Sequence, residues 1–546
     1  MIQKSARIAA GDAIETDICI IGAGPAGVTL ALALRGSGKR ILLLEAGGLK
    51  RAGKTAQSLY EGQSENLAFH QLPDSDRTRG LGGTSSMWGG RCMPYDEIDF
   101  ALRPHMHGSG WPISFETLLP FYGRAQKAVD CGDWAYTAPQ AHLPGTMIEG
   151  AQTDDLRLDT LERWSPPTHF GKSNRAALEA AQDITVLTDV VVTELVYAGE
   201  QITRAEAVVL RGGAGFSVRA GQFVLAGGGL ETARLLMHSK AANGQKLGDH
   251  SGWLGRGYMC HVGGVIARLV LKPGHEVIFG YEQDGDGVYV RRRLTLSAQA
   301  QWRHGLPNMY ALLDRPLLDD ASHQSAILSL TYLAKRVLQR QTTDASARDG
   351  GAFAHYKRHI RNLVFGAPEV LTVLPRFGRN RFLQGRRIPS LLTKPDSSDF
   401  YLYFHAEQSA VKASAVYLGE ERDALGMRRL HIDAKLDGED AAGIVRAHDV
   451  IGQELEKTGA GRLEYLGQDP EALVRACKCT LGHHIGTTRM AALPEDGVVD
   501  ADARVFHTRN LFVASASILP TSSQAHPTLT VLALALRLAD HLKATA

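Results

Sequence analysis

The hydrophobic pattern near the start of the chain predicts a βαβ unit. Residues 17–21 (DICII) are apolar and β-branched, which indicates a buried strand, and residues 28–34 continue as an apolar helix. Residues 40–44 (RILLL) indicate a second strand. The turn GAGPAG at residues 22–27 joins the first strand to the helix. Its glycines permit a tight turn and close approach to a diphosphate, which the helix N-terminus stabilises with free N–H groups and its positive dipole.

An acidic residue completes this pattern. Glu45 ends the second strand, eighteen residues after Gly27, where a carboxylate accepts a hydrogen bond from an adenosine ribose hydroxyl. We therefore predict a dinucleotide site made by Gly22, Gly24, Gly27 and Glu45. The carboxylate favours FAD or NAD over NADP, because it repels a 2′-phosphate.

Later in the chain, the pattern predicts a second group of strands. Residues 184–209, which precede these strands, have the period-two pattern of a hairpin. Residues 439–457, which follow them, have apolar positions at helical spacing. The predicted strands are residues 265–270, 277–280, 288–296, 400–407, 413–418 and 429–432. A chain of 546 residues is long enough to hold these elements in two or three domains.

Composition narrows the class of protein. Hydrophobic residues make up 44% and charged residues 22% of the chain, as in an ordinary soluble globular protein. The formal net charge of +2 gives no reason to expect a nucleic-acid partner. The six cysteines are scattered without a metal or redox spacing, so we expect reduced thiols and no metal site. The N-terminus lacks an apolar signal segment and residues 529–538 are too short to span a bilayer, so we expect a cytoplasmic protein.

Two further glycine-rich segments indicate close contact with a flat or charged group. Residues 79–95 (RGLGGTSSMWGGRCMPY) contain glycines on both sides of Trp88 and Met87, and such bulky residues are unusual at a mobile loop tip. Residues 223–234 (FVLAGGGLETAR) again have the order strand, glycine turn and helix.

Two segments near the C-terminus carry candidate catalytic histidines. Residues 482–490 (GHHIGTTRM) contain His483, and residues 524–536 (QAHPTLTVLALAL) contain His526 directly before a helix start at Pro527. A neutral histidine is suited to take the proton of an alcohol, because its ordinary pKa is about 6.5. We predict that the two histidines act as a pair.

These motifs together resemble one enzyme family. GAGPAG at 22–27, GLGGTSSMWGG at 80–90, LAGGGLETARLL at 225–236 and the run from Gly482 to Leu542 follow the order found in the glucose-methanol-choline (GMC) oxidoreductases. The resemblance implies an α/β fold, with a Rossmann-like FAD-binding domain of discontinuous segments and an α+β substrate-binding domain with an antiparallel sheet.

The predicted domains divide the chain into alternating segments. We assign residues 1–150, 180–262 and 475–546 to the FAD-binding domain. Residues 151–179 and 263–474 then form the substrate-binding domain.

Some motifs resemble the sugar (pyranose) oxidase and dehydrogenase branch of the family. These are SGWPI at 109–113 and GLETARLL at 229–236. Covalent-FAD members of this branch carry a histidine before the tryptophan of the glycine loop, whereas this chain has Met87, so we expect noncovalent FAD. His526 stands where much of the branch has asparagine, which makes the His/His pair found in other GMC oxidases.

The resemblance implies roles for individual residues. His483 is the expected base, and His526 is the residue expected to orient the hydroxyl. The reverse assignment of the two roles stays open. Ser515 stands where many relatives have an aspartate near the ribityl-phosphate region, so its backbone is the expected contact. The expected FAD-binding residues are Gly22, Gly24, Gly27, Glu45, Gly82, Gly83, Thr84, Ser85, Trp88, Gly89, Gly90, Val191, Ala226, Gly227, Ser515, Ala516, Pro527 and Thr528.

The predicted function is FAD-dependent oxidation of an alcohol, with a sugar or glycoside hydroxyl as the first candidate. Hydride passes to flavin N5, and the electron acceptor is oxygen, a quinone or a redox protein. Alternatives are a small or aryl alcohol, an alcohol intermediate of a natural product, and a redox-silent flavoprotein scaffold. The histidine pair argues against the silent scaffold. Within FHAEQ, His405, Glu407 and Gln408 are candidates to line the substrate pocket, and the alternative for them is an ordinary strand.

One internal segment is strongly basic. Between Lys335 and Asp399 the chain has thirteen Lys/Arg against five Asp/Glu, with apolar residues interleaved. The plain interpretation is a solvated helical insertion. The alternative is a surface for an anionic membrane, an anionic substrate or a partner.

Overall fold

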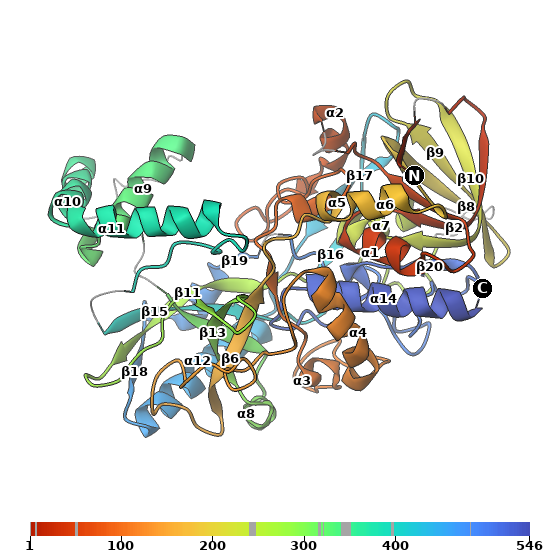
Figure 1. Ribbon diagram of the computed structural model, residues 1–546. Helices are drawn as coiled ribbons and strands as arrows, with labels where there is room; N and C mark the ends of the chain where they lie inside the picture. The colour runs from red at the N-terminus through yellow and green to blue at the C-terminus, as the bar shows by residue number, and fades with distance from the viewer. Residues whose placement is uncertain are drawn as a thin grey trace.

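The computed structural model describes residues 2–5, 8–49, 53–239, 247–314, 318–319, 321–339, 351–394, 398–480 and 482–545. Figure 1 shows two sheet-containing halves, with α14 (Thr528–Thr545) beneath the half that holds the N-terminus and three helices standing apart beside the other half.

An eight-stranded sheet organises the nucleotide-binding half. Its order is β1-β7-β3-β2-β10-β9-β8, and β20 also pairs with β10. Along this order β1, β7, β3, β2 and β10 pair in parallel, and β20 pairs in parallel with β10. β9 and β8 continue the sheet in antiparallel pairs. The strands are β1 (Ile2–Lys4), β2 (Ala13–Ile21), β3 (Ile41–Glu45), β7 (Ile184–Thr188), β8 (Val190–Ala198), β9 (Gln201–Val209), β10 (Gly215–Leu225) and β20 (Leu511–Val513).

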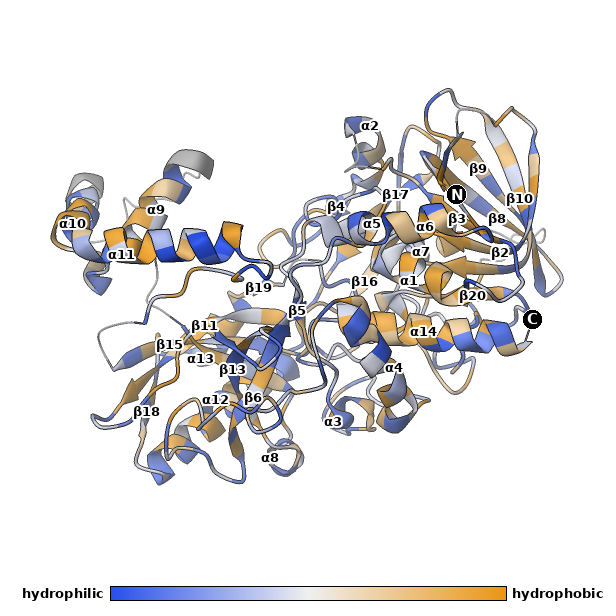
Figure 2. Cartoon of the chain, viewed as in Figure 1, coloured by the Kyte–Doolittle hydropathy of each residue, from blue (hydrophilic) through white to orange (hydrophobic). Residues whose placement is uncertain are grey.

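Hydrophobic burial explains the centre of this sheet. All five residues of β3 (ILLLE) are buried, as expected for a strand covered on both faces. Helix α1 (Pro25–Leu34) begins with Pro25, whose fixed φ suits the first turn, and it packs against α14. Figure 2 shows that α14 is apolar along most of its length and hydrophilic toward the C-terminus.

A nine-stranded sheet organises the other half. Its order is β18-β11-β15-β14-β13-β6-β5, with β12 beside β13 and β19 beside β11, and every pair is antiparallel. The predicted α/β fold with an antiparallel second sheet is confirmed. The strands are β5 (Arg91–Cys92), β6 (Leu156–Trp164), β11 (Val262–Leu271), β12 (Glu282–Gln283), β13 (Tyr289–Leu296), β14 (Met309–Asp314), β15 (Asp399–Ala406), β18 (Gly461–Tyr465) and β19 (Lys478–Cys479).

Two predicted elements differ from the structure. Residues 277–280 form no strand: Val277 makes a single bridge with Ile148, and Phe279 packs on Phe400 instead of extending a ladder. That prediction was wrong because the apolar side chains serve packing. Residues 184–209 form three strands, since β7 joins the parallel sheet and only β8 and β9 make the hairpin.

The remaining predicted elements occur close to their expected positions. α12 (Gly438–Lys457) packs on β18, while β16 (Ala415–Arg422) and β17 (Arg428–Asp433) form a small sheet with β4 (Gln63–Ser64). That small sheet contacts α7 (Gly228–His238) of the nucleotide-binding half. β5 and β19, which lie in segments assigned above to the FAD-binding domain, pair into the nine-stranded sheet.

The basic segment is largely helical. It contains the end of α9 (Ala326–Gln339) and the whole of α10 (Gly351–Phe365), α11 (Ala367–Gly378) and the π-helix η6 (Arg379–Leu383). Residues 340–350 and 395–397 of this segment lie outside the described residues. Among the described residues, no helix has the length and apolar character needed to cross a membrane.

Candidate active site

Four segments that are far apart in sequence meet through close backbone contacts. A Cβ atom at Gly22 would lie 2.5 Å from the carbonyl oxygen of Ala226, so the first glycine turn packs on the third glycine segment. A Cβ at Gly83 would lie 3.0 Å from Cα of Gly24, and one at Gly229 would lie 1.9 Å from the carbonyl oxygen of His484. Glycine is required at these positions because backbone occupies the space of a side chain.

A large cleft opens where these segments meet. It encloses ≈ 1530 Å³ of space, part of it open to solvent. Twelve of the eighteen predicted FAD-binding residues line it: Gly22, Gly24, Glu45, Gly83, Thr84, Val191, Ala226, Gly227, Ser515, Ala516, Pro527 and Thr528.

The cleft fits FAD. A Cβ atom at Gly24 would have no protein atom within 4 Å, so the backbone there leaves room for a ligand at the N-terminus of α1. The residues that line the cleft include Glu45 at the end of β3 as well as Pro527 and Thr528 at the start of α14.

Glu45 binds the backbone of two loops at the cleft. Its carboxylate accepts hydrogen bonds from the N–H groups of Ala23 (3.0 Å), Gly47 (2.7 Å) and Gly80 (2.9 Å). Burial raises the pKa of Glu45, and these three N–H donors oppose the rise. Glu45 thereby ties the first glycine turn to the loop before the second, in addition to facing the cleft.

Six predicted FAD-binding residues do not line the cleft. A Cβ at Gly27 would lie 1.9 Å from the carbonyl oxygen of Gly22, and the N–H of Gly82 donates to the carbonyl of Ala23 (2.8 Å). Trp88 donates from Nε1 to the carbonyl of Thr168 (2.9 Å). Ser85, Gly89 and Gly90 also lie outside the lining of the cleft.

The structure also places an arginine cluster at the cleft that sequence reasoning missed. Arg77 and Arg79 both stack on the ring of Tyr60, at 4.0 and 4.1 Å from its centroid, and both pair with Glu231. Although burial opposes it, the charges of Arg234, Arg79 and Arg77 lower the pKa of Glu231 to about 2. The sequence signal for this cluster was the presence of charged residues within the glycine-containing segments RTRGLGG and GLETAR.

The predicted histidine pair is brought together. The rings of His483 and His526 lie 4.5 Å apart between centroids in an edge-to-face arrangement. Their sequence neighbours Gly482, His484, Pro527 and Thr528 line the cleft. The pair therefore lies next to the cleft.

Hydrogen bonding determines which nitrogen of His483 is free. Nε2 of His261 lies 3.0 Å from the carbonyl oxygen of Ser522, so it carries the proton and Nδ1 of His261 is an acceptor. Nδ1 of His483 lies 2.8 Å from that acceptor and therefore carries its own proton. The lone pair of His483 is thus on Nε2, as a base requires.

Burial keeps this histidine group uncharged. Burial lowers the pKa of His483 well below its usual value, and positive charge on His261 and His484 would lower it further. The pKa of His526 is lowered by the same cause, with His483 and Arg91 adding to it. Burial also lowers the pKa of His261 to about 4.

His405 joins the group from β15. Its ring stacks on that of His526 at 5.0 Å, and its Nδ1 lies 2.9 Å from the carbonyl oxygen of Gln524. Ring nitrogens of His261, His405 and His483 lie within 4.8 Å of one another, a spacing that a metal ion could also use. The proton shared by His483 and His261 favours a hydrogen-bonded group of neutral imidazoles over a cation site.

His484, the neighbour of His483 in sequence, lines the cleft. Its Nδ1 lies 2.8 Å from the hydroxyl of Tyr258, and its Nε2 lies 3.2 Å from Asp76. Although burial opposes it, His484 lowers the pKa of the Asp76 carboxyl. The two adjacent histidines thus face different neighbours. His483 faces the other histidines of the group, and His484 forms part of the cleft wall.

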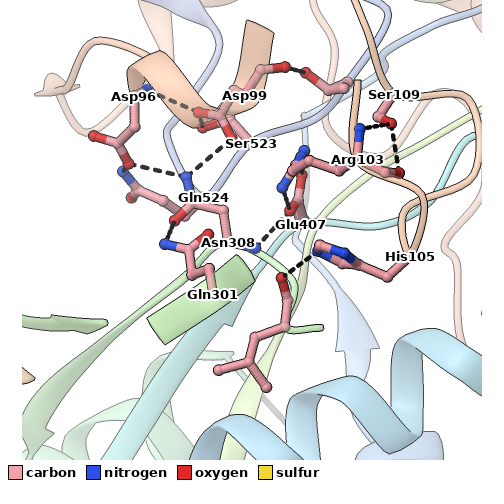
Figure 3. Close-up of polar contacts among 12 residues, drawn as sticks. Asp96, Asp99, Arg103, His105, Ser109, Gln301, Asn308, Glu407, Ser523 and Gln524 are labelled. Carbon is pink, nitrogen blue, oxygen red and sulfur yellow. Dashed lines mark hydrogen bonds and ion pairs between the residues drawn. The ribbon is translucent and has the colours of Figure 1, made fainter. Parts of the chain in front are cut away.

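A buried polar network holds the loop that carries His526 (Figure 3). Gln524 donates to Asp96 (2.9 Å) and accepts from Arg293 (2.7 Å). Ser523 donates to Asp99 (2.5 Å), and the amide of Asn308 donates to both Asp96 and Asp99 at 2.9 Å. The loop is therefore fixed between the two halves of the molecule.

The other two substrate-pocket candidates lie in this framework. Glu407 is buried in an ion pair with Arg103, with Nη2 of Arg103 at 2.9 Å from Oε2 of Glu407 (Figure 3). Gln408 accepts from the N–H of Cys260 (3.0 Å) and donates to the carbonyl of Lys435. Of the three candidates, only His405 contacts the histidine pair.

A polar wall faces His526. Nη1 of Arg91 lies 3.4 Å from Nε2 of His526 and 2.8 Å from the hydroxyl of Tyr310, and Nε of Arg91 pairs with Glu162 at 3.2 Å. The guanidinium also lies 5.4 Å from the ring of Trp164. The Arg91 contact assigns the lone pair of His526 to Nε2.

Comparisons with known proteins agree with this architecture. Residues 410–535 match the family model described as GMC oxidoreductase, and residues 16–252 match that of pyridine nucleotide-disulphide oxidoreductase. The chain is 22% identical over 596 aligned positions to 2-methyl-1,2-propanediol dehydrogenase of Mycolicibacterium austroafricanum, covering 97% of this chain and 95% of the relative. It is 32% identical over 116 residues, 21% of each chain, to C-glycoside 3-oxidase of Arthrobacter globiformis. Pyridoxine 4-oxidase from Mesorbium loti has the same fold, with a TM-score of 0.58 at 20% identity, covering 97% of this chain and 99% of that one.

The resemblance to the GMC oxidoreductases is therefore confirmed, and the chain carries the C-terminal domain of that family. It is an FAD-dependent oxidoreductase that acts on CH–OH groups of a small molecule and passes the electrons to an acceptor.

Two glycine substitutions separate folding from cofactor binding. In Gly27→Ala the new Cβ meets the Gly22 carbonyl at 1.9 Å, so we expect a lower melting temperature for the apoprotein and the holoprotein. In Gly24→Ala the Cβ meets only the cleft, so we expect an unchanged apoprotein and FAD affinity lower by roughly 10- to 100-fold. Calorimetry and FAD titration measure both, and unchanged FAD affinity in Gly24→Ala would contradict this placement of the cofactor.

Proposed function

We propose that this protein oxidises a secondary hydroxyl of a sugar or glycoside to the carbonyl, with His483 as the base. The observation that carries the proposal is the tautomer of His483. His261 holds the proton on Nδ1 of His483 and leaves Nε2 free beside His526 next to the FAD cleft.

The protein residues handle the hydroxyl and its proton. Nε2 of His483 takes the proton as the C–H bond of the substrate breaks, and His526 with Arg91 positions the oxygen. Noncovalent FAD, when bound along the cleft, supplies the hydride acceptor. Backbone donors and the arginines Arg77, Arg79 and Arg234 of the cleft would hold the cofactor. Gly24 would lie against it at the helix N-terminus, and Glu45 would lie at the adenosine end.

The low pKa of the histidines serves this role. A base that is already neutral needs no prior loss of a proton at physiological pH. The neutral neighbours His261 and His405 also let His483 become an imidazolium during the reaction without facing a fixed positive charge from them.

The wall opposite the histidine pair supports a polyhydroxylated substrate. Arg91, Glu162 and Tyr310 place polar groups beside His526, and the guanidinium of Arg91 lies over the ring of Trp164. Neighbouring hydroxyls of a sugar ring can use several of these groups at once, whereas a simple alcohol uses one. C-glycoside 3-oxidase, one of the relatives, is named for glycoside oxidation. Oxygen, a quinone or a redox protein remains the proposed electron acceptor.

The direct test is anaerobic mixing of the purified flavoprotein with sugars, glycosides, aliphatic diols and aryl alcohols. We expect the flavin absorbance to bleach with the sugar or glycoside class. His483→Ala should retain FAD and lose the rate of bleaching by roughly 10²- to 10⁴-fold, the usual effect of removing a general base. His541→Ala, at a histidine of α14 outside the site, is the matched control and should bleach like the wild type.

Other results of that experiment have clear meanings. Bleaching by aryl or aliphatic alcohols alone would replace the sugar by the alternative substrate class. No bleaching by any compound, in a protein whose flavin dithionite reduces, would favour the redox-silent scaffold. Readmitting air after bleaching shows whether oxygen accepts the electrons.

The pH profile of flavin reduction follows from the lowered pKa of His483. Because the neutral base is the populated form above the folded pKa, we expect the reduction rate to be constant from neutral to alkaline pH. It should fall only as the pH drops below the usual histidine range, where His483 takes up a proton. Rapid-mixing measurements across this range test it, and a rate that rises tenfold per unit through about pH 8 would exclude His483 as the base.

Arg91 is the residue that tests the substrate class. Arg91→Lys keeps the charge next to Glu162 but loses the planar guanidinium, so we expect kcat/KM for a sugar to fall by roughly 10- to 100-fold, mainly through KM. Steady-state kinetics measure the effect, with Arg124→Lys at the surface ion pair to Asp540 as the matched control. A variant with unchanged kcat/KM would remove Arg91 from substrate recognition.

A further inference from the structure

A helical arm projects from the substrate half of the molecule. We define it as residues 351–394, which contain α10, α11 and η6. Figure 1 shows α10 and α11 together with α9 beside the nine-stranded sheet and away from α14. The catalytic group described above uses no residue of this arm.

α10 buries polar side chains against α9 and exposes apolar side chains between its basic ones. Its polar residues His355, His359 and Asn362 are buried and face α9, where Nδ1 of His359 lies 3.0 Å from the hydroxyl of Ser329. Its apolar residues Ile360 and Val364 point outward, with exposed fractions of 54% and 67%. In a helix whose outer face meets only water, the opposite arrangement is expected.

The next helix continues the apolar surface. α11 has no buried residue along its twelve positions, and Leu371 on it is 74% exposed. Phe365 before it and Phe382 and Leu383 after it are at least 76% exposed. Figure 2 shows apolar and hydrophilic turns alternating along α11. Large apolar side chains gathered on one surface element mark a contact site.

Positive charge surrounds these apolar side chains. The arm has nine Lys/Arg against one acidic residue, Glu369. The basic residues are Lys357, Arg358, Arg361, Arg376, Arg379, Arg381, Arg386, Arg387 and Lys394. Lys357, Arg361, Arg376, Arg379 and Arg387 are exposed. A second copy of the chain meeting this surface through the same arm would bring two strongly positive faces together, which disfavours self-association.

We propose that the helical arm binds the surface of an anionic lipid bilayer. Exposed Phe, Leu, Ile and Val side chains enter the boundary between headgroups and acyl chains, while arginines and lysines pair with the lipid phosphates. This is peripheral binding, since no described helix can cross the membrane.

The base of the arm reaches the neighbourhood of the active site. Arg386 pairs with Asp130 (2.8 Å), and Ser390 bonds to the hydroxyl of Tyr281 (2.8 Å). The ring of Tyr281 packs on Trp164 (5.0 Å), the residue beneath Arg91. Membrane binding by the arm therefore brings the active-site wall close to the lipid surface, where a lipid-linked substrate or a quinone is found.

Vesicle sedimentation tests the proposal with the full-length FAD-loaded protein. We expect binding to vesicles of phosphatidylcholine with phosphatidylglycerol, no binding to phosphatidylcholine alone, and release by salt. Arg361→Gln/Arg376→Gln/Arg379→Gln should lower the partition coefficient on the order of 100-fold at low salt. Phe382→Ser/Leu383→Ser should lower it at least roughly tenfold, because two exposed apolar side chains lose their insertion.

Matched variants on the nucleotide-binding half serve as controls. Arg35→Gln/Arg211→Gln/Arg219→Gln removes three exposed arginines there, and Leu102→Ser removes a leucine that is 75% exposed; both should bind vesicles like the wild type. Bound flavin and melting temperature confirm that each variant is folded. Equal binding by the two arginine triples, or no binding to anionic vesicles, would overturn the proposal. A dimer that Phe382→Ser/Leu383→Ser dissociates would also overturn it, by assigning the arm to self-association.

Discussion

Backbone contact between four glycine-containing segments is the constraint on which the rest of this structure depends. These segments are the turn after β2, the loop at residues 80–90, the start of α7 and the histidine loop at residues 482–490. A Cβ atom at Gly22 or Gly229 would overlap a carbonyl group, and one at Gly83 would press on the Cα of Gly24. Each contact joins segments that are far apart in sequence. Because glycine has no side chain, the four chain segments can lie close together around one cleft, and the cofactor occupies the remaining space.

The catalytic end is built by hydrogen bonds to backbone carbonyls. Ser522 and Gln524 present their carbonyls to His261 and His405, and this sets the tautomer of both rings. The same loop is anchored through Ser523 and the Gln524 side chain to Asp99 and Asp96. A loop held on both sides keeps His526 in place beside His483, and the buried surroundings keep both rings neutral, which is the state that a base needs.

Burial has different effects on different parts of the molecule. Around the histidines it excludes charge, whereas around Glu231 and Glu407 it is compensated by arginines at ion-pair distance. On the arm, apolar residues remain exposed and polar ones are buried. The two halves and the arm thus solve different problems: binding a nucleotide, positioning a hydroxyl, and presenting an outward-facing apolar and basic surface.

Much of the fold and part of the site follow from local pattern. GAGPAG, Glu45 and the strand pattern determined the βαβ unit, because glycine placement and hydrophobic period act within a few residues. The motifs also pointed to His483 and His526, which the fold brings together. Residues 277–280 were misjudged because an apolar run has the same appearance whether it pairs in a ladder or packs singly.

Tertiary structure alone decided the rest. The contact of His261 with His483, the turn of His484 toward the cleft and the use of Glu407 for Arg103 all depend on contacts between residues more than two hundred positions apart. His405 reaches the same group through a contact with Gln524, 119 positions away. The burial of polar side chains on α10 also comes from tertiary packing, here against the neighbouring α9, because the sequence records a basic, apolar-rich helix but not which face it turns to α9. The sequence by itself determined the motifs and the cofactor class, because those are local, whereas the direction in which each side chain points is set by whichever distant segment packs against it.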